Sequence, residues 1–386
     1  MPIVVGVLLS VSIALLFSAM HGFLDLQIYR VDTRAWLFDD SALYGATIPV
    51  AGHTDLPFTY PPSAAILMIP LAIMPLWLAE ILVTASSLAC LGVTIWLVLS
   101  RVRPDLELRT KVTLATTAVV VLIAIEPVRT TLWFGQINLV LMAAVALDCL
   151  TEKPRWPRGM LIGIAAVTKL TPAAFVLYFL IRKDWKAAGT AAATSAAVVL
   201  GGFLLFPDES RQYWFHALRD TNRIGSPDYV GNQSIKGMVY RLGLTNSAAT
   251  AVWLGVGLVI VGAGAVLMYH LFTERAVVAA LFTNAAVLLL ISPVSWTHHW
   301  VWAGPALVAA IAWATTRTGY APFATIAVFA LLFLIGPGIV PNGRHQELEW
   351  AWWQHIPGDI YIFAAFALLA IGVGRLLKQR AQLSRV

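Results

Sequence analysis

A succession of long apolar runs is the feature that most constrains how this chain can fold. The 386 residues contain ten such runs, and most approach or exceed the roughly 20 residues that a helix needs to cross a bilayer. Only 12% of the residues are charged, against about a quarter in a soluble globular domain, so that class is excluded. We therefore predict an all-α polytopic membrane protein. The runs lie near residues 3–19, 77–99, 112–126, 136–151, 187–206, 249–272, 276–292, 299–316, 320–339 and 357–376.

The segment 159–182 determines the number of spans. Basic clusters flank both of its ends, so it is either one span broken at Thr171–Pro172 or a hairpin of two short helices. Termini on the same side of the membrane require an even number of crossings, which favours the hairpin and gives about twelve membrane segments. With both termini in the cytoplasm, 16 of the 26 Lys and Arg residues lie inside and nine outside, in agreement with the positive-inside rule. The predicted single membrane domain, 1–386, then has outer loops at 21–76, 207–246 and 340–356.

The first outer loop carries a carboxylate, Asp25, directly after the first predicted helix. Partial desolvation at the membrane surface raises the pKa of a carboxyl group and a nearby cation lowers it, so its basicity can be matched to proton abstraction. A solvated aspartate that merely flanks the helix is the alternative. The apolar stretch after Pro61–Pro62, about 12 residues long, is too short to span, which predicts an interfacial helix at 62–74.

Polar residues also gather in the turn after the third span and at the start of the next helix. Arg129 could neutralise a phosphate, and Gln136 and Asn138 could bond sugar hydroxyls. The alternative is an ion pair between Arg129 and Glu126 together with ordinary helix capping.

A single lysine, Lys169, lies inside the apolar segment 159–182. Burying an ammonium group in a membrane is costly, so such a lysine indicates a functional site with an anionic partner. The alternative is that its long side chain reaches out to the interface.

Cations and amides accumulate in the outer segment 207–246, and two adjacent histidines begin a later helix. The mixture of cations and amides suits the binding of an anionic headgroup and sugar hydroxyls, and it is equally typical of a solvated loop. Adjacent histidines on a helix point about 100° apart, so they are a poor chelating pair but can orient separate groups. Tryptophans near predicted interfaces are typical of aromatic belts, although their rings also stack on sugars. The residues are Asn232, Gln233, Lys236, Arg241, Trp296, His298 and His299.

Several function classes lose support because the sequence lacks their motifs. It contains no Walker loop, Rossmann fingerprint or HExxH, which argues against ATP-driven transport and nucleotide-sugar chemistry. Cys90 and Cys149 both lie in apolar runs, so neither a disulfide framework nor a zinc ribbon is expected. An enzyme of this kind would need an activated donor already in the membrane. A transporter is the main non-enzyme alternative, but it should place ionisable residues near the midplane rather than outside.

Six short motifs occur in order along residues 25–299: Asp25–Tyr29, Phe58–Pro62, Gly135–Asn138, Lys169–Pro172, Asn232–Ser234 and Ser292–His299. Together they resemble the actinobacterial GT-C glycosyltransferases of family 87. The resemblance implies a GT-C fold and an inverting enzyme that moves mannose from polyprenyl-phosphate-β-mannose to a phosphatidylinositol mannoside. The α-1,2 linkage would form at the outer face of the plasma membrane. A lipomannan or lipoarabinomannan acceptor and a lipid-linked arabinose donor are the alternatives among enzymes.

The resemblance also implies roles for individual residues. Asp25 matches the first-loop aspartate of the family, the expected catalytic base, and no metal, cofactor or nucleic acid is expected. The residues nominated to hold the donor phosphate and sugar are Arg129, Lys169, Lys236, Arg241, His298 and His299. Those nominated for the acceptor sugar are Tyr29, Tyr60, Gln136, Asn138, Asn232, Gln233 and Trp296.

Overall fold

The structure is a computed structural model that describes residues 6, 22–39, 42–44, 57–220 and 224–383. Within these ranges the regular structure is helical and no strand forms, apart from an isolated bridge between Asn232 and Trp296. The predicted all-α class is therefore confirmed. The first apolar run, 3–19, apart from Gly6, and parts of the first outer loop lie outside the described residues.

Four of the described helices are long and apolar enough to cross a membrane: α4 (Leu76–Val102), α10 (Trp185–Leu205), α13 (Asn246–Thr273) and α18 (Ile360–Leu383). The pair α5 (Leu108–Leu122) and α6 (Glu126–Phe134) forms a fifth candidate, bent by 78° at its junction. At about 1.5 Å per residue, a helix as long as α4 reaches about 40 Å, more than the ~30 Å hydrocarbon core of a bilayer. The chain is thus a multi-pass membrane protein.

Other apolar helices in the described ranges are shorter than a full span. Helix length alone therefore does not yield the predicted twelve crossings. They include α3 (Pro62–Ile73), α7 (Asn138–Leu150), the stretch Thr171–Arg182, α14 (Val277–Ile291), α15 (Ala303–Ala314) and α16 (Ala321–Ile335).

The segment 159–182 is broken, but earlier than the sequence suggested. Helix α8 (Met160–Thr168) ends before Lys169, whose backbone is extended, and the 3-10 helix η1 (Thr171–Phe175) then leads into α9 (Val176–Arg182). Pro172 lies in the first turn of η1, where its missing N–H is harmless. The break therefore falls at Lys169–Leu170, and it places the lysine in an irregular segment instead of a helix.

Short helices occupy the predicted interfacial segment 62–74 and parts of the predicted outer loops 207–246 and 340–356. α3 fills the first, and α11 (Pro207–Phe215) lies in the second. In the third, η6 (Gln346–Glu349) precedes η7 (Trp352–Gln354) and α17 (His355–Gly358).

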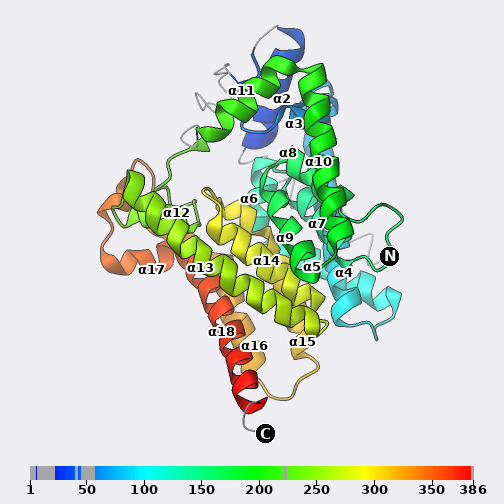
Figure 1. Cartoon of the computed structure of the whole chain (residues 1–386), viewed down its shortest axis with the longest axis vertical. Coiled ribbons are helices and arrows are strands. Elements are labelled where there is room, and N and C mark those ends of the chain that lie inside the picture. Colours follow the sequence, from blue (N-terminus) through cyan, green and yellow to red (C-terminus); the bar gives the residue numbers. More distant parts are fainter. Residues whose placement is uncertain (1–5, 7–21, 40–41, 45–56, 221–223, 384–386) are drawn as a thin grey trace.

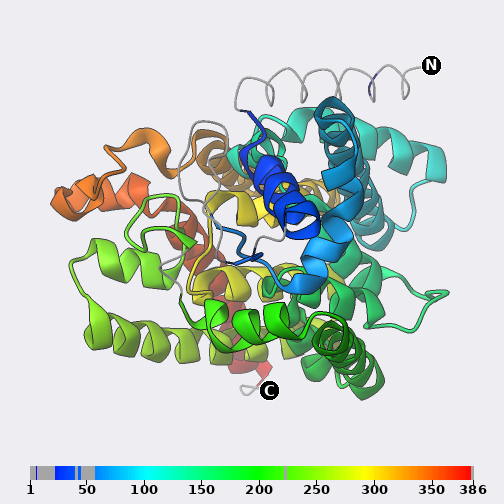
Figure 2. The ribbon, with the colours of Figure 1, turned by 90° about the horizontal axis from the view of Figure 1, so that it is seen from above.

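Two buried clusters hold the elements around the site in place. The larger joins side chains of α4, α5, α7, α14 and α15. The smaller packs Tyr29 of α2 (Leu24–Phe38) with Phe58, Tyr60 and residues of α3 against α7 and α8. In Figure 1, α2, α3 and α11 lie at one end of the molecule, and the C-terminal end of α18 lies at the other. The view from above places α2 and α3 (blue) across the molecule from α12 (Ile235–Arg241) and the orange segment before α18 (Figure 2).

Candidate active site

A glycine turn brings the end of α6 onto the first turn of α2. Gly135 ends α6 with φ 65° and ψ 35°, a left-handed conformation that glycine adopts without steric cost. A Cβ atom at this position would lie 2.7 Å from the Cβ atom of Leu26, so a side chain would force the two elements apart. The close approach brings the next residue, Gln136, into hydrogen-bond contact with the side chain of Asp25.

The buried Gln136 side chain is the centre of a hydrogen-bond network. Its Oε1 atom accepts a bond from the Tyr29 hydroxyl at 3.0 Å, and the Tyr60 hydroxyl and Lys169 Nζ each lie 3.4 Å away. The two tyrosine hydroxyls are 2.9 Å apart. Because the amide oxygen receives these donors, the amide nitrogen is the end left to donate to the Asp25 carboxylate.

Lys169 is buried beside this network instead of reaching out to solvent. Its side chain is 8% exposed, and Nζ donates to Asn138 Oδ1 at 2.9 Å. The ammonium group also lies 5.4 Å from the centre of the Tyr60 ring, where the negative ring face attracts a cation. The alternative of a lysine that extends to the interface is therefore wrong. Its positive charge acts on Asp25, the anionic partner that the sequence required.

The electrostatics of Asp25 suit a base. The side chain is half-buried, and burial raises its pKa to about 6, although the hydrogen bond from Gln136 and the charge of Lys169 both lower it. Desolvation destabilises the carboxylate, whereas a donor and a cation stabilise it. A carboxyl group with this pKa is mostly ionised at pH 7 and still basic enough to accept a proton.

The two histidines lie on the 3-10 helix η4 (Thr297–Trp302), which packs against α6. The His298 carbonyl accepts hydrogen bonds from Asn138 Nδ2 at 2.9 Å and Thr131 Oγ1 at 3.0 Å, so the backbone of η4 is tied to the same region as Lys169. The sequence pointed to the polar turn after the third span as a candidate site, but it did not single out Thr131 within that turn.

Both imidazole rings retain a buried nitrogen without a partner. The rings pack edge to face with centroids 4.9 Å apart. His298 Nε2 and His299 Nδ1 have no hydrogen-bond partner within the described ranges. Because buried polar atoms are normally bonded, these two nitrogens are available to a ligand.

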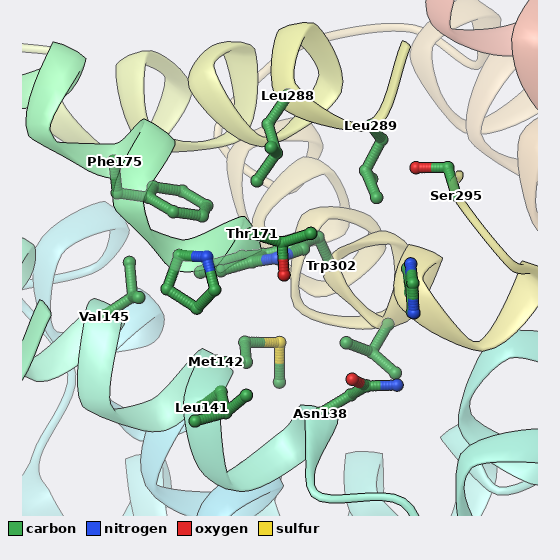
Figure 3. Close-up of a pocket in the computed structure, with 13 residues that line it drawn as sticks. Asn138, Leu141, Met142, Val145, Thr171, Phe175, Leu288, Leu289, Ser295 and Trp302 are labelled. Atoms are coloured by element: carbon green, nitrogen blue, oxygen red, sulfur yellow. The ribbon is translucent and has the colours of Figure 1, made fainter. Parts of the chain in front are cut away.

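A small cavity of about 40 Å³ adjoins the network. Figure 3 shows Asn138 and Ser295 at one side of it and the apolar side chains of Val145 and Phe175 at the other. The volume holds a few water molecules and is too small for a sugar ring. Asn138, which accepts a hydrogen bond from Lys169, lines the polar end of the cavity. The cavity therefore continues from the Asp25 network into the helix bundle.

Three of the nominated residues have structural roles elsewhere. Arg241 forms a fully buried ion pair with Asp359 and donates its remaining N–H groups to backbone carbonyls. Asn232 and Gln233 likewise bond backbone groups on both sides of their loop. Donors and acceptors that are already satisfied cannot bind a phosphate or a sugar without breaking these contacts. The structure thus gives these three side chains contacts within the fold, and their nomination as donor or acceptor ligands stays a prediction.

Two nominated cations also lie apart from the Asp25 network. The Lys236 ammonium group stacks over Trp253 at 5.4 Å. The Arg129 guanidinium lies 5.1 Å from the Trp133 ring and donates to the Ala124 carbonyl at 2.8 Å. Among the described residues, neither cation forms a hydrogen bond or an ion pair with Asp25.

The alternative of an ion pair between Arg129 and Glu126 is not found within the described ranges. Glu126 instead accepts a 2.8 Å bond from the Tyr361 hydroxyl. Trp296 lies against Tyr229 with ring centroids 6.0 Å apart, and it lines a second cavity outside the Asp25 network.

A second carboxylate on α2 was missed from the sequence. Asp32 is 2% exposed and neither of its oxygens has a hydrogen-bond partner within the described part of the chain. Burial raises its pKa to about 7. Asp32 follows Asp25 by seven residues and Tyr29 by three, a spacing that places the three side chains on one face of α2.

Comparison with known proteins identifies a family. A family model described as glycosyltransferase family 87 matches residues 58–293. A polyprenol-phosphate-mannose-dependent alpha-(1-2)-phosphatidylinositol mannoside mannosyltransferase of Mycolicibacterium smegmatis is 38% identical over 90% of this chain and 83% of its own. A protein of the same description from Mycobacterium tuberculosis is 35% identical, over 90% and 84%.

Two more distant similarities were found. A polyprenol-phosphate-mannose-dependent alpha-(1-2)-phosphatidylinositol pentamannoside mannosyltransferase of Mycolicibacterium smegmatis is 32% identical over 96% of this chain and 89% of its own. Among solved structures, ArnT from Cupriavidus metallidurans bound to undecaprenyl phosphate superposes with a TM-score of 0.47 and 17% identity, over 97% of this chain and 72% of that chain.

Proposed function

This chain belongs to glycosyltransferase family 87, and we propose that it is an inverting α-1,2-mannosyltransferase of GT-C architecture. Its donor is polyprenyl-phosphate-β-mannose and its acceptor is a phosphatidylinositol mannoside. The descriptions of the relatives support the donor and the acceptor class. The observation that carries the proposal is the convergence of Asp25, Gln136 and Lys169 from three separate motifs into one hydrogen-bonded cluster.

Asp25 is the base of the transfer. The acceptor 2-hydroxyl gives its proton to the Asp25 carboxylate as its oxygen attacks C1 of the donor mannose on the face opposite the phosphate. The new O2–C1 bond forms while the bond from C1 to the phosphate oxygen breaks, and the bonding electrons leave with the polyprenyl phosphate. A single displacement inverts the anomeric centre from β to α, so one carboxylate suffices.

Lys169 and the two histidines hold the departing phosphate. A lysine ammonium group has three donors, and Lys169 directs two of them at Gln136 and Asn138, which leaves one for the donor lipid. His298 Nε2 and His299 Nδ1 provide two more bonding atoms. Preorganised donors in a site that excludes water stabilise the negative charge that develops on the phosphate.

The acceptor sugar is held by the polar groups around Asp25. The hydroxyls of Tyr29 and Tyr60, together with the Gln136 amide, surround the carboxylate with groups that can bond neighbouring sugar hydroxyls. Asn138 connects this group to Lys169. The base and the phosphate-binding groups are therefore linked through shared hydrogen bonds.

We infer that the active site opens on the outer face of the plasma membrane in a single domain, 1–386, with twelve membrane segments and both termini in the cytoplasm. The 16-to-nine distribution of basic residues supports this orientation. The exposed apolar side chains of Phe38, Ile73 and Trp77, at the ends of α2, α3 and the start of α4, support an interfacial position for α3.

The test is mannose transfer by the purified protein from polyprenyl-phosphate-mannose to a tetramannosylated phosphatidylinositol. We expect product from the wild type with and without EDTA, and a loss of about 100-fold or more for Asp25→Asn, the range of general-base catalysis. Asp39→Asn, an exposed aspartate at the other end of α2, is the matched control and should retain activity. Full activity in Asp25→Asn would refute its role, and transfer only from a lipid-linked arabinose would identify another donor.

A further inference from the structure

A second cavity, distinct from the Asp25 network, lies between the loop before α12 and the loop before η6. It has a volume of about 170 Å³ and is lined by Gly225, Ser226, Asp228, Tyr229, Trp296, Gly343, Arg344, His345 and Glu347. Trp296 and His298 are two residues apart. The short segment that carries the histidines into the active site therefore also forms a wall of this cavity.

The most informative group in the cavity is Glu347. The residue is 0% exposed, and its Oε1 atom accepts bonds from the backbone N–H groups of Gly343 at 2.9 Å and Val230 at 3.0 Å. Its Oε2 atom is buried and has no partner among the described residues. A buried carboxylate oxygen without a hydrogen bond is costly, so this atom is a ready acceptor for a ligand donor.

A second carboxylate, Asp228, also lines the cavity. Burial raises the pKa of Asp228, but hydrogen bonds from Ser226 and His345 outweigh it and hold the pKa below its usual value. The His345 ring nitrogen lies 2.9 Å from the Asp228 carboxylate. The exposed Arg344 also lines the cavity, so the lining combines a cationic donor with carboxylate acceptors, a mixture that suits hydroxyl groups, which both donate and accept hydrogen bonds.

The aromatic residues point to the class of ligand. Tyr229 and Trp296 line the cavity with rings tilted by 58° to each other, and aromatic faces pack against the C–H face of a sugar ring. A small cavity that combines such faces with carboxylate acceptors recognises a neutral, polyhydroxylated ring. It offers no long apolar channel for a lipid chain.

We propose that this cavity is a second sugar-binding subsite, which holds a mannose of the acceptor glycan other than the one that reacts at Asp25. The proposal rests on the proposed mannosyltransferase function and deepens it. Glu347 and Asp228 accept hydrogen bonds from the hydroxyls of that sugar, and Trp296 packs against its ring. The subsite selects acceptors whose glycan is long enough to reach both places.

The test compares a long and a short acceptor in the variant Glu347→Gln. The glutamine keeps the Oε1 acceptor for the two backbone N–H groups and removes the negative charge. We expect the KM for a tetramannosylated phosphatidylinositol to rise about tenfold, the equivalent of one hydrogen bond to a charged group. The KM for an alkyl α-mannoside with a single sugar should rise much less. Trp296→Ala should show the same selectivity.

The matched control is Glu349→Gln, an exposed glutamate of the same 3-10 helix, which should change neither KM. An equal rise of KM for both acceptors, or no change for the long one, would overturn the subsite. Binding of methyl α-mannoside by saturation-transfer NMR separates the subsite from the reaction. Because methyl α-mannoside can also occupy the reacting site, the expected result is binding that is kept in Asp25→Asn and weakened in Glu347→Gln. This result supports the subsite even if no transfer is detected, and equal binding by the wild type and Glu347→Gln, or absence of binding to the wild type, would refute it.

Discussion

The Tyr29 hydroxyl lies 3.0 Å from Gln136 Oε1 and determines which way round the Gln136 amide faces. A hydroxyl that donates to the amide oxygen leaves the amide nitrogen to donate to Asp25. Tyr29 thereby influences the basicity of Asp25, which lies on the same helix, through the side chain of Gln136. The pair links the first outer loop to the turn after α6.

Replacing Gln136 by methionine should impair the base without a large change of volume. Loss of the amide donor raises the pKa of Asp25 further, because that hydrogen bond lowers it. We expect kcat/KM at pH 7 to fall about tenfold, the equivalent of one hydrogen bond to a charged group, and to recover partly at pH 8. Tyr29→Phe, which keeps the amide, should show a smaller loss. A greater loss in Tyr29→Phe than in Gln136→Met would contradict this arrangement.

The pH dependence of transfer should report the ionisation of Asp25. The base acts in its ionised form, so kcat/KM should rise with pH through a midpoint near the pKa of about 6 and level off above it. The charge of Lys169 lowers that pKa, so Lys169→Met should move the midpoint to higher pH and also raise the KM for the donor lipid. Lys236→Met, whose cation lies over Trp253, is the control and should keep the wild-type midpoint. An unchanged midpoint in Lys169→Met would mean that the two groups do not interact.

A methyl group at Gly135 should disrupt the contact between α6 and α2. Gly135→Ala places a Cβ atom 2.7 Å from Leu26 Cβ in a left-handed backbone conformation, which costs about 1–3 kcal/mol from backbone strain alone. We expect a lower Tm in detergent and reduced transfer, because Gln136 moves relative to Asp25. Gly189→Ala in α10 is the matched control: no atom lies within 4 Å of its Cβ position. It should leave Tm unchanged or raise it.

Asp32 should make folding stability depend on pH. Its pKa is raised from 3.8 to about 7 by burial, so the folded protein favours the protonated form and loses stability as pH rises from about 4 to about 7. Asp32→Asn removes the ionisable group, and its Tm should exceed that of the wild type at pH 8, with a difference that shrinks toward pH 4. A lower Tm for the variant at pH 8 would indicate that the carboxylate has a stabilising partner.

Much of the architecture followed from local features of the chain. The length and polarity of the apolar runs predicted helices, and the double proline at 61–62 correctly marked the start of α3. The break in the segment 159–182 was expected, but its position was displaced to Lys169–Leu170 because a proline fits the first turn of η1.

The sequence by itself determined that this is a helical membrane protein of family 87 and which motifs carry its polar residues. It nominated both Lys169 and Arg241 for the donor phosphate and did not show which partners their side chains have. The tertiary structure decided between them: Asp359 and three backbone carbonyls satisfy Arg241, whereas Lys169 is buried next to Asp25 with a donor to spare. The physical reason is that these partners come from distant parts of the chain, and only packing brings them within hydrogen-bond distance.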